Sequence, residues 1–205
     1  MVIVERGCAS LLDHRALRAM FEDRKKVFVD LLKWKVPVLE NRFEIDQFDD
    51  EHATYIIIAG ENGDHLGSVR LLPTVRPHIL GTLFPELCAD PPPRGRDVFE
   101  ITRFCLSRRY GAAARLKTRN LLVSALAAYA LEAKIRTYTG VAQMSWLQQI
   151  LAFGWDCRPL GIPARLECGM MGALAIEITS RTPALLAANG IWSETPHPAR
   201  MPEAA

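Results

Sequence analysis

The stretch that decides how this chain is interpreted is Val98-Phe99-Glu100-Ile101-Thr102-Arg103-Phe104, in which a carboxylate and a guanidinium interrupt an otherwise β-rich, apolar run. Charged side chains are seldom fully buried unless they pair with an opposite charge or take part in chemistry. Arg24 breaks the apolar face of the first predicted helix in the same way, and Arg70 interrupts the run 67–74. Several isolated charges at predicted core positions indicate one shared polar pocket.

Length and composition describe one globular protein. The chain has 205 residues, 49% hydrophobic and 23% charged, which suits one sizeable core but not two ordinary domains. The net charge of +2 does not indicate a nucleic-acid partner. The spacing of the cysteines does not indicate a zinc site. Residues 1–7 do not indicate a signal peptide, and no apolar run reaches the roughly 18 residues of a membrane span. We expect a single cytoplasmic domain over 1–205, without metal or membrane contact, and a frayed tail at about 192–205.

The pattern of apolar residues predicts mixed strands and helices. Strands are expected at 2–6, 53–59, 65–72, 97–107, 135–143 and 172–179, and helices at 12–32, 112–134, 145–153 and 183–189. A short helical turn is expected around 80–84, a loop or short strand at 155–167, and the aperiodic segment 33–52 is long enough to be a functional loop. This order indicates an α/β fold, a three-layer α/β/α sandwich on a mixed sheet. A doubly wound nucleotide-binding fold is disfavoured, because no glycine-rich turn follows the first strand.

Several motifs, taken in order, resemble those of the acyl-homoserine-lactone (autoinducer) synthase family. They are Arg24-x3-Phe28-x5-Trp34, Glu44-x-Asp46-x2-Asp49, Gly67-Ser68-x-Arg70-Leu71-Leu72-Pro73-Thr74, Phe84, and Glu100-Ile101-Thr102-Arg103-Phe104. The resemblance covers about the first half of the chain with its spacing intact, and the second half matches loosely. It implies a fold similar to the GCN5-related N-acetyltransferases. It also implies a reaction of S-adenosylmethionine with an acyl thioester, carried by coenzyme A or an acyl carrier protein, that yields a quorum-sensing lactone and methylthioadenosine. Both reactants are substrates, and no cofactor is implied.

The functional groups of S-adenosylmethionine suit these residues. A guanidinium binds a carboxylate through a bidentate fork, which points to Arg24 or Arg103. Aromatic faces suit a sulfonium and an adenine ring, and Phe28 and Trp34 are available. The amine must lose a proton before it attacks the thioester, and Glu100, acting directly or through one water, is the expected base. We therefore expect Glu100 and Arg103 to be the catalytic residues.

The resemblance assigns a larger set of residues to the S-adenosylmethionine pocket. Besides Glu100, they are Arg24, Phe28, Trp34, Asp46, Asp49, Arg70, Phe84 and Arg103. Some of these are expected to be structural, with Asp46 or Asp49 pairing with an arginine to hold the segment 33–52. Glu100 and Arg103 point to opposite faces of a regular strand. They share a site only if the strand is irregular, so we predict a bulge between Glu100 and Phe104.

The acyl donor is expected to contact later residues. Arg108-x-x-Gly111-x-Ala113 fits the R-x-x-G-x-A loop with which acetyltransferases hold the diphosphate of coenzyme A at a helix start, and it favours that donor. Arg115, Lys117 and Arg119 follow and suit either donor. Residues expected at the donor site or in the wall of the acyl pocket are Phe104, Arg108, Gly111, Ala113, Thr139, Val141, Met144, Trp146 and Met170. Trp146 would shorten that pocket or stack on a branched or aromatic acyl group.

Each feature also has a plain structural explanation. Arg24 alone is typical of a surface arginine, the acidic run 44–51 of a solvated loop, and Glu100 with Arg103 of a structural ion pair. Their joint occurrence in one order favours a shared function. Two other functions stay open: an ordinary N-acetyltransferase of a small amine, which releases no methylthioadenosine, and a non-catalytic S-adenosylmethionine-binding module.

Overall fold

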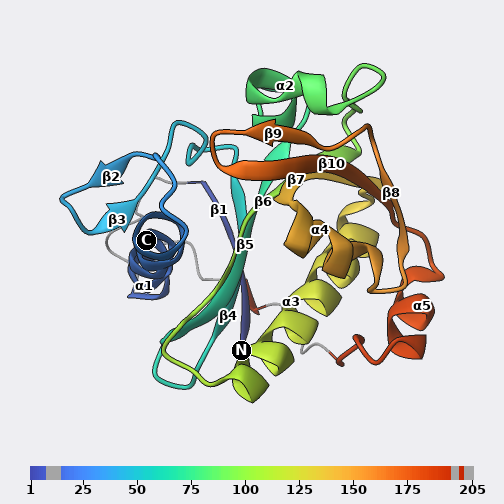
Figure 1. The fold of residues 1–205 in the computed structure, drawn as a ribbon. Helices are drawn as coiled ribbons and strands as arrows, with labels where there is room; N and C mark the ends of the chain where they lie inside the picture. Colours follow the sequence, from blue (N-terminus) through green and yellow to red (C-terminus); the bar gives the residue numbers. More distant parts are fainter. Residues whose placement is uncertain (8–14, 195–198, 201–205) are drawn as a thin grey trace. The chain divides into compact units, whose positions relative to one another are not determined.

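The computed structural model describes residues 1–7, 15–194 and 199–200, and the chain divides into two compact units. Unit 1 is drawn from residues 1–70, 103–125 and 194–205, and unit 2 from residues 71–102 and 126–193. Strands β5 (His65–Pro73) and β6 (Val98–Leu106) and helix α3 (Ala112–Ala133), labelled in Figure 1, each have residues in both units. The expected single domain stays a prediction, and most of the expected frayed tail lies outside the described residues.

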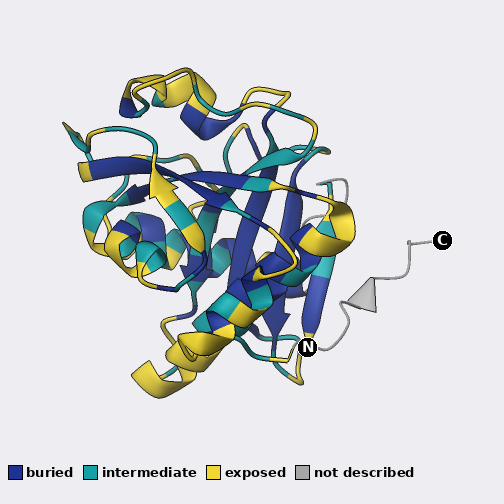
Figure 2. Ribbon diagram, turned by 90° about the vertical axis from the view of Figure 1, so that its right-hand side faces the viewer, coloured by how far each residue is buried: buried dark blue, intermediate teal, exposed yellow. Residues whose placement is uncertain are grey.

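Unit 1 combines strands with one long helical segment. Its elements besides parts of β5, β6 and α3 are β1 (Val2–Arg6), α1 (Arg15–Arg24), η1 (Lys25–Leu31), β2 (Val38–Leu39), β3 (Phe43–Glu44), β4 (Thr54–Ala59) and β11 (Ala199–Arg200). Strand β1 pairs antiparallel with β4 and parallel with β11, and β5 follows β4 in the sheet. Helix α1 packs against β3 and β4. Every residue of β4 is buried, and Figure 2 shows long runs of buried residues along the strands of the sheet.

The first helix changes type where its buried charge lies. Met20, Arg24 and Phe28 are all buried, as the shared helical face predicted. The helix is α-helical only to Arg24, and η1 is a π-helix. The predicted beginning of the helix at Leu12 lies outside the described residues. A π-helix is rare and occurs often at functional sites, and no periodic pattern in the sequence predicts it.

Unit 2 holds the rest of the sheet. Its further elements are α2 (Ile79–Leu83), the 3₁₀ turn η2 (Pro85–Leu87), β7 (Thr137–Gln143), α4 (Met144–Leu151), β8 (Asp156–Pro159), β9 (Ala164–Leu166), β10 (Gly169–Glu177) and α5 (Thr182–Ala188). Strand β6 runs parallel to β7, in register from Val98↔Thr137 to Ile101↔Gly140. Strand β10 pairs antiparallel with β7, β8 and β9. Helix α4 packs on β7 and β10.

The structure confirms the predicted α/β fold on a mixed sheet. The predicted helix 112–134 is α3, the predicted helix 145–153 is α4, and the turn around 80–84 is α2. The sequence did not predict the hairpin of β2 and β3, because each of its strands has only two residues. Among the described residues, no helix combines the length and apolarity that crossing a membrane requires.

Candidate functional site

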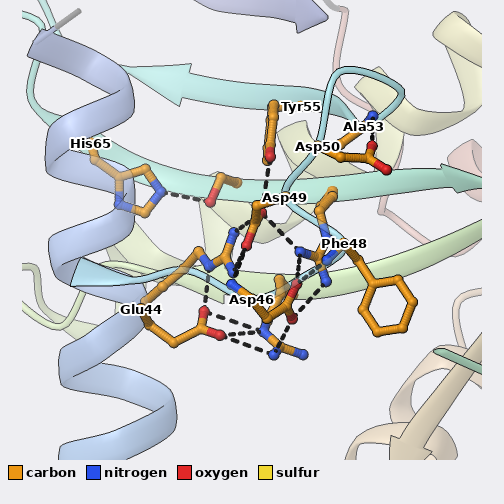
Figure 3. A network of polar contacts seen from close by, with 12 residues as sticks. Glu44, Asp46, Phe48, Asp49, Asp50, Ala53, Tyr55 and His65 are labelled. Carbon is orange, nitrogen blue, oxygen red and sulfur yellow. Dashed lines mark hydrogen bonds and ion pairs between the residues drawn. The ribbon is translucent and has the colours of Figure 1, made fainter. Parts of the chain in front are cut away.

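Unit 1 buries a network of three arginines and three carboxylates: Arg24, Arg70, Arg103, Glu44, Asp46 and Asp49. Their side chains are between 0% and 8% exposed. Figure 3 shows the three acids turned toward the guanidinium groups, with dashed lines marking the contacts. Equal numbers of opposite charges let all six groups lie in the interior, where an unpaired charge would be costly.

Arg24 has every guanidinium nitrogen occupied by a carboxylate. Its Nε donates to Glu44 Oε2 at 2.6 Å, and its Nη1 and Nη2 donate to the two oxygens of Asp49 at 2.8 Å. Burial alone would lower the pKa of Arg24, but Asp49 and Glu44 raise it above its usual value. With its side chain 1% exposed and all three nitrogens in contact with a carboxylate, Arg24 organises the surrounding acids.

Asp46 and Asp49 hold the segment 33–52 through Arg70, as the sequence predicted. Arg70 Nη1 and Nη2 donate to Asp46 at 2.6 and 3.1 Å, and Nη1 lies 2.8 Å from Asp49 Oδ1. Tyr55, whose role sequence reasoning missed, donates its hydroxyl to Asp49 Oδ1 at 2.9 Å. Burial alone would raise the pKa of Asp49, but Arg24 and Arg70 hold it below its usual range. The loop is therefore fixed by ionised carboxylates.

Glu44 is a second residue that the predicted site omitted. It is fully buried and joins two arginines, since Arg24 Nε donates to Oε2 and Arg103 Nη2 donates to Oε1 at 2.9 Å. The signal was present, because Glu44 opens the motif Glu44-x-Asp46-x2-Asp49. Its partner Arg103 lies 59 positions away in the sequence, so only the fold shows the contact.

Arg103 lies where β6 is irregular. Its φ of +51° is left-handed, which a non-glycine residue seldom adopts, and this confirms the predicted irregularity between Glu100 and Phe104. Its guanidinium donates to Glu44 and to Asp46, and its side chain keeps 8% exposure. The strained backbone thus directs Arg103 to the acids of unit 1.

Two aromatic rings lie beside Arg103. The guanidinium carbon is 5.5 Å from the Phe28 ring centre and 5.9 Å from that of Trp34. Phe28 and Trp34 stack at 4.9 Å with 20° between their planes, and the Trp34 backbone N–H donates to the Phe28 carbonyl at 2.9 Å. The buried indole Nε1–H of Trp34 has no hydrogen-bond partner among the described residues. This group offers a cation, two ring faces and one unused donor.

Unit 2 holds the predicted base. Glu100 is fully buried, and its Oε1 accepts the backbone N–H of Leu80 at 2.9 Å. Thr139 is in register with Glu100 on β7 and is also fully buried. Its hydroxyl has no hydrogen-bond partner in the described part of the chain. A hydroxyl buried without a partner is uncommon, and it suits a polar ligand atom.

An apolar cluster surrounds Leu80 in unit 2. Its buried members are Leu80, Leu87, Met171 and Ala173, and Phe84 and Val141 pack against them. Val141 was predicted to line the acyl pocket, and an apolar setting fits that role. Phe84, which was predicted to contact S-adenosylmethionine, also packs against this cluster, and its contact with the substrate stays a prediction.

The other predicted acyl residues fall in both units. Trp146 contacts Phe153 edge-to-face, with ring centres 5.8 Å apart. The Met144 sulfur lies 3.6 Å from the position that a Cβ at Gly172 would occupy, so Met144 packs on β10. Phe104, Arg108, Gly111 and Ala113 belong to unit 1. Among the described residues, no group of three or more histidine, cysteine, aspartate or glutamate side chains could hold a metal ion.

Several solved structures resemble this fold. A putative N-acetyltransferase from Lactobacillus plantarum superposes with a TM-score of 0.57 at 15% identity, over 87% of this chain and 98% of that one, which shows the fold alone. The structure of the CoA-dependent acyl-homoserine lactone synthase BjaI with SAM and isopentyl-CoA superposes with a TM-score of 0.82 at 25% identity, over 100% of this chain and 95% of that one. The TofI structure, a ternary complex with an inhibitor and MTA, gives a TM-score of 0.75 at 29% identity, over 91% of this chain and 96% of that one.

Sequence comparison identifies the family. The profile of the autoinducer synthase family matches residues 9–177. The acyl-homoserine-lactone synthase of Ralstonia nicotianae is 32% identical over 188 residues, which are 88% of this chain and 91% of that enzyme. The synthase of Ralstonia solanacearum is 39% identical over 88 residues, 42% of this chain and 43% of that enzyme, and that of Pseudomonas fluorescens is 34% identical over 103 residues, 49% and 53%. The last two alignments thus span about half of those enzymes or less. The chain belongs to the autoinducer synthase family.

Proposed function

We propose that this chain is an acyl-homoserine-lactone synthase, an acyltransferase that joins the acyl group of a thioester to S-adenosylmethionine and releases methylthioadenosine. The observation that carries the proposal is the group formed by Arg103, Phe28 and Trp34, which offers a cation and aromatic faces for the zwitterionic, sulfonium-bearing substrate. The BjaI and TofI structures, which contain SAM with isopentyl-CoA and MTA respectively, belong to relatives of the same fold and support this substrate pair.

The arginines divide the work on the substrate carboxylate. Arg103 is the residue that contacts it, because its side chain keeps 8% exposure and lies against the two rings. Arg24 and Arg70 are saturated by acids and hold Glu44, Asp46 and Asp49 in place, so they act as positioning residues. The unused indole N–H of Trp34 donates to an acceptor of the substrate.

Glu100 is the base of the first step. Its carboxylate is held by the Leu80 N–H and takes a proton from the methionyl amine, directly or through one water. The amine nitrogen then attacks the thioester carbonyl, the amide bond forms, and the donor thiolate leaves and is protonated. In the second step the methionyl carboxylate oxygen attacks the carbon next to sulfur, the C–S bond breaks, and methylthioadenosine departs. The sulfonium is itself a good leaving group, so we propose that no metal or other cofactor takes part.

The acyl chain is received by unit 2. Thr139 supplies a hydroxyl for the acyl group, and Val141, Met144 and Trp146 line its path beside the apolar cluster. The turn that precedes α3, with Gly111 and Ala113, receives the phosphate-bearing end of the donor. At Gly111 no atom of the described residues lies within 4 Å of where a Cβ would be, so the approach to α3 is open there. Because both substrates belong to the cytoplasmic metabolite pool, we propose a cytoplasmic location.

The test is an assay of both products. Purified protein is incubated with S-adenosylmethionine and a panel of acyl-CoAs and acyl carrier proteins, and methylthioadenosine and lactone are measured by mass spectrometry. We expect both products in equal amounts, and a loss of about 100-fold or more in kcat for Glu100→Gln. The control is Glu86→Gln in η2, whose side chain is exposed. Acetyl transfer without methylthioadenosine would instead indicate an ordinary N-acetyltransferase, and binding without turnover would indicate a non-catalytic module.

A further inference from the structure

A second buried polar group lies in unit 1, and the proposed reaction does not use it. Asp23, His65 and Ser68 are 2%, 0% and 1% exposed. His65 Nδ1 lies 3.0 Å from Asp23 Oδ2, and His65 Nε2 lies 2.9 Å from Ser68 Oγ. Figure 3 shows the His65 ring turned toward this hydroxyl. Asp23 directly precedes Arg24, so the last two residues of α1 direct opposite charges into different parts of the interior.

The protonation states in this group follow from burial and partners. Burial alone would raise the pKa of Asp23, but hydrogen bonds from His65 and Ser107 hold it below its usual range. Burial lowers the pKa of His65 more than Asp23 raises it. Asp23 is therefore ionised and His65 neutral at pH 7. The neutral ring donates from Nδ1 to Asp23 and accepts the Ser68 hydroxyl at Nε2, which fixes the Asp23 carboxylate in one orientation.

Arg109 is attached to this group from the turn before α3. Its Nη2 donates to Asp23 Oδ2 at 3.2 Å and to the His65 carbonyl at 3.3 Å, and its Nε donates to Ser107 Oγ at 3.3 Å. Its side chain nevertheless stays 44% exposed. Within the described residues no hydrogen bond engages Nη1. The guanidinium is thus held along one edge and open along the other.

The neighbouring Arg108 is a natural comparison. It carries the same charge, is also exposed, and is the arginine of the R-x-x-G-x-A motif. No hydrogen bond or ion pair joins Arg108 to any other described residue. A phosphate that binds Arg108 must order a flexible side chain, whereas Arg109 is already ordered. Preorganisation of this kind raises affinity by reducing the entropy lost on binding.

We propose that Arg109, rather than Arg108, binds the phosphate at the end of the pantetheine arm of the acyl donor, and that Asp23 is its positioning residue. This inference rests on the proposed function and names the group that recognises the donor. The same phosphate chemistry occurs in acyl-CoA and in an acyl carrier protein. A guanidinium with one open edge suits either source, because arginine binds phosphate through paired N–H donors.

A purely structural role of Asp23 would have different consequences. If the group only stabilised α1, its loss would disturb Arg24 and the S-adenosylmethionine site as much as the donor site. If it positions Arg109, the effect is confined to the donor. The KM values of the two substrates separate these roles.

The test compares Arg109→Ala with Arg108→Ala, which remove the same charge from adjacent exposed positions. KM is measured for butanoyl-CoA, for butanoyl acyl carrier protein and for S-adenosylmethionine. We expect Arg109→Ala to raise the donor KM about tenfold or more, Arg108→Ala less than about threefold, and neither to change KM for S-adenosylmethionine by more than about twofold. If KM rises for just one of the two donors, that donor is the source of the phosphate. Equal effects of the two variants, or a parallel rise for S-adenosylmethionine, would overturn the proposal.

Asp23→Asn tests the positioning role. We expect Asp23→Asn to raise the donor KM about threefold to tenfold when Arg109 is present. In the Arg109→Ala background we expect the same substitution to leave the donor KM unchanged. Additive effects in the double variant would contradict the proposed role of Asp23. If Asp23→Asn does not fold, Ser107→Ala removes the acceptor of Arg109 Nε and takes its place in the same cycle.

A binding experiment separates this proposal from the proposed function. Coenzyme A is titrated into wild-type protein and both arginine variants by calorimetry, where no turnover is needed. We expect the dissociation constant to rise about tenfold in Arg109→Ala and to change little in Arg108→Ala. That result, without methylthioadenosine release in the assay, would refute the synthase function and keep the phosphate site. Lactone synthesis together with equal coenzyme A binding in all three proteins would refute the phosphate site and keep the synthase function.

Discussion

The two units fill their interiors with different chemistry. Unit 1 buries three guanidinium groups and three carboxylates in one network. Unit 2 instead buries an apolar cluster of Leu80, Leu87, Met171 and Ala173, and the backbone N–H of Leu80 donates to Glu100. A buried ion pair is often no more stable than a well-packed apolar group of the same size. The network of unit 1 is therefore better explained by what it holds in place, namely Arg103 beside Phe28 and Trp34, than by stability alone.

The largest expected effect comes from breaking the network. Asp49→Ala removes the partner of Arg24 and Arg70 and the acceptor of Tyr55, and leaves buried cations with too few counter-charges. We expect the free energy of unfolding, measured by urea denaturation, to fall by about 3–5 kcal/mol. The control is Glu51→Ala, whose side chain is 82% exposed and which should change stability by less than about 0.5 kcal/mol. Equal losses in the two variants would show that the network is not a buried one.

The matching change in unit 2 is Leu87→Ala. This side chain is fully buried, and its removal leaves a cavity, so we expect a loss of about 2–4 kcal/mol in the free energy of unfolding. Leu83→Ala, at a position 47% exposed, serves as control. Calorimetric titration with S-adenosylmethionine sharpens the comparison. We expect Asp49→Ala to weaken the affinity of the protein for this substrate, and Leu87→Ala to change that affinity less than about twofold. Weaker binding in Leu87→Ala alone would contradict the role of the charged network in holding S-adenosylmethionine.

Two buried tyrosines allow a finer comparison. The Tyr55 hydroxyl donates to the carboxylate of Asp49 in unit 1, and the Tyr138 hydroxyl donates to the Leu126 carbonyl in unit 2. Hydrogen bonds to charged groups contribute more than those to neutral ones. We expect Tyr55→Phe to cost about 1.5–3 kcal/mol and Tyr138→Phe about 0.5–1.5 kcal/mol in denaturant unfolding. The reverse order would mean that Asp49 does not depend on this donor.

The smallest expected effect is a pH dependence that belongs to unit 1. The folded-state pKa of His65 lies below its unfolded value, so the unfolded chain binds more protons as the pH falls below about 6.5. This contribution to stability is complete above that pH and is lost as the pH falls toward the folded pKa. We expect melting temperatures measured between pH 7.5 and pH 5.5 to fall less steeply in His65→Gln than in wild type. His52→Gln, whose wild-type side chain is 35% exposed, is the control, and an unchanged slope in His65→Gln would contradict the assignment.

Local patterns were enough to predict most of the fold. The periodic apolar residues of 112–134 predicted α3, and the β-rich runs around Gly60–Asp64 predicted β4 and β5. The π-helical turn after Arg24 was not predictable, because no periodic pattern in the sequence indicates it. The predicted strand 172–179 begins earlier, at Gly169, since strand ends depend on the partner strand.

The site was predicted in its residue types more than in its contacts. Arg24 or Arg103 was expected to bind the substrate carboxylate, which stays a prediction. The contacts of Arg24 with Glu44 and Asp49 were not predictable, because those partners lie 20 and 25 positions away. The irregular strand at Arg103 was predictable, because Glu100 and Arg103 would otherwise point to opposite faces. The group of Asp23, His65 and Arg109 carried no sequence signal, since its members are separated by as many as 86 positions.

The central claim is that the network of unit 1 presents Arg103, with Phe28 and Trp34, to S-adenosylmethionine. Calorimetric titration of this substrate into wild type, Arg103→Met and Arg42→Met tests it most directly, because Arg42 is also an aromatic-stacked arginine of unit 1 but is 59% exposed. The account predicts binding by wild type and Arg42→Met with similar affinity, and affinity at least about tenfold weaker for a folded Arg103→Met. Unchanged affinity in Arg103→Met, or no binding by the wild-type protein, would contradict it.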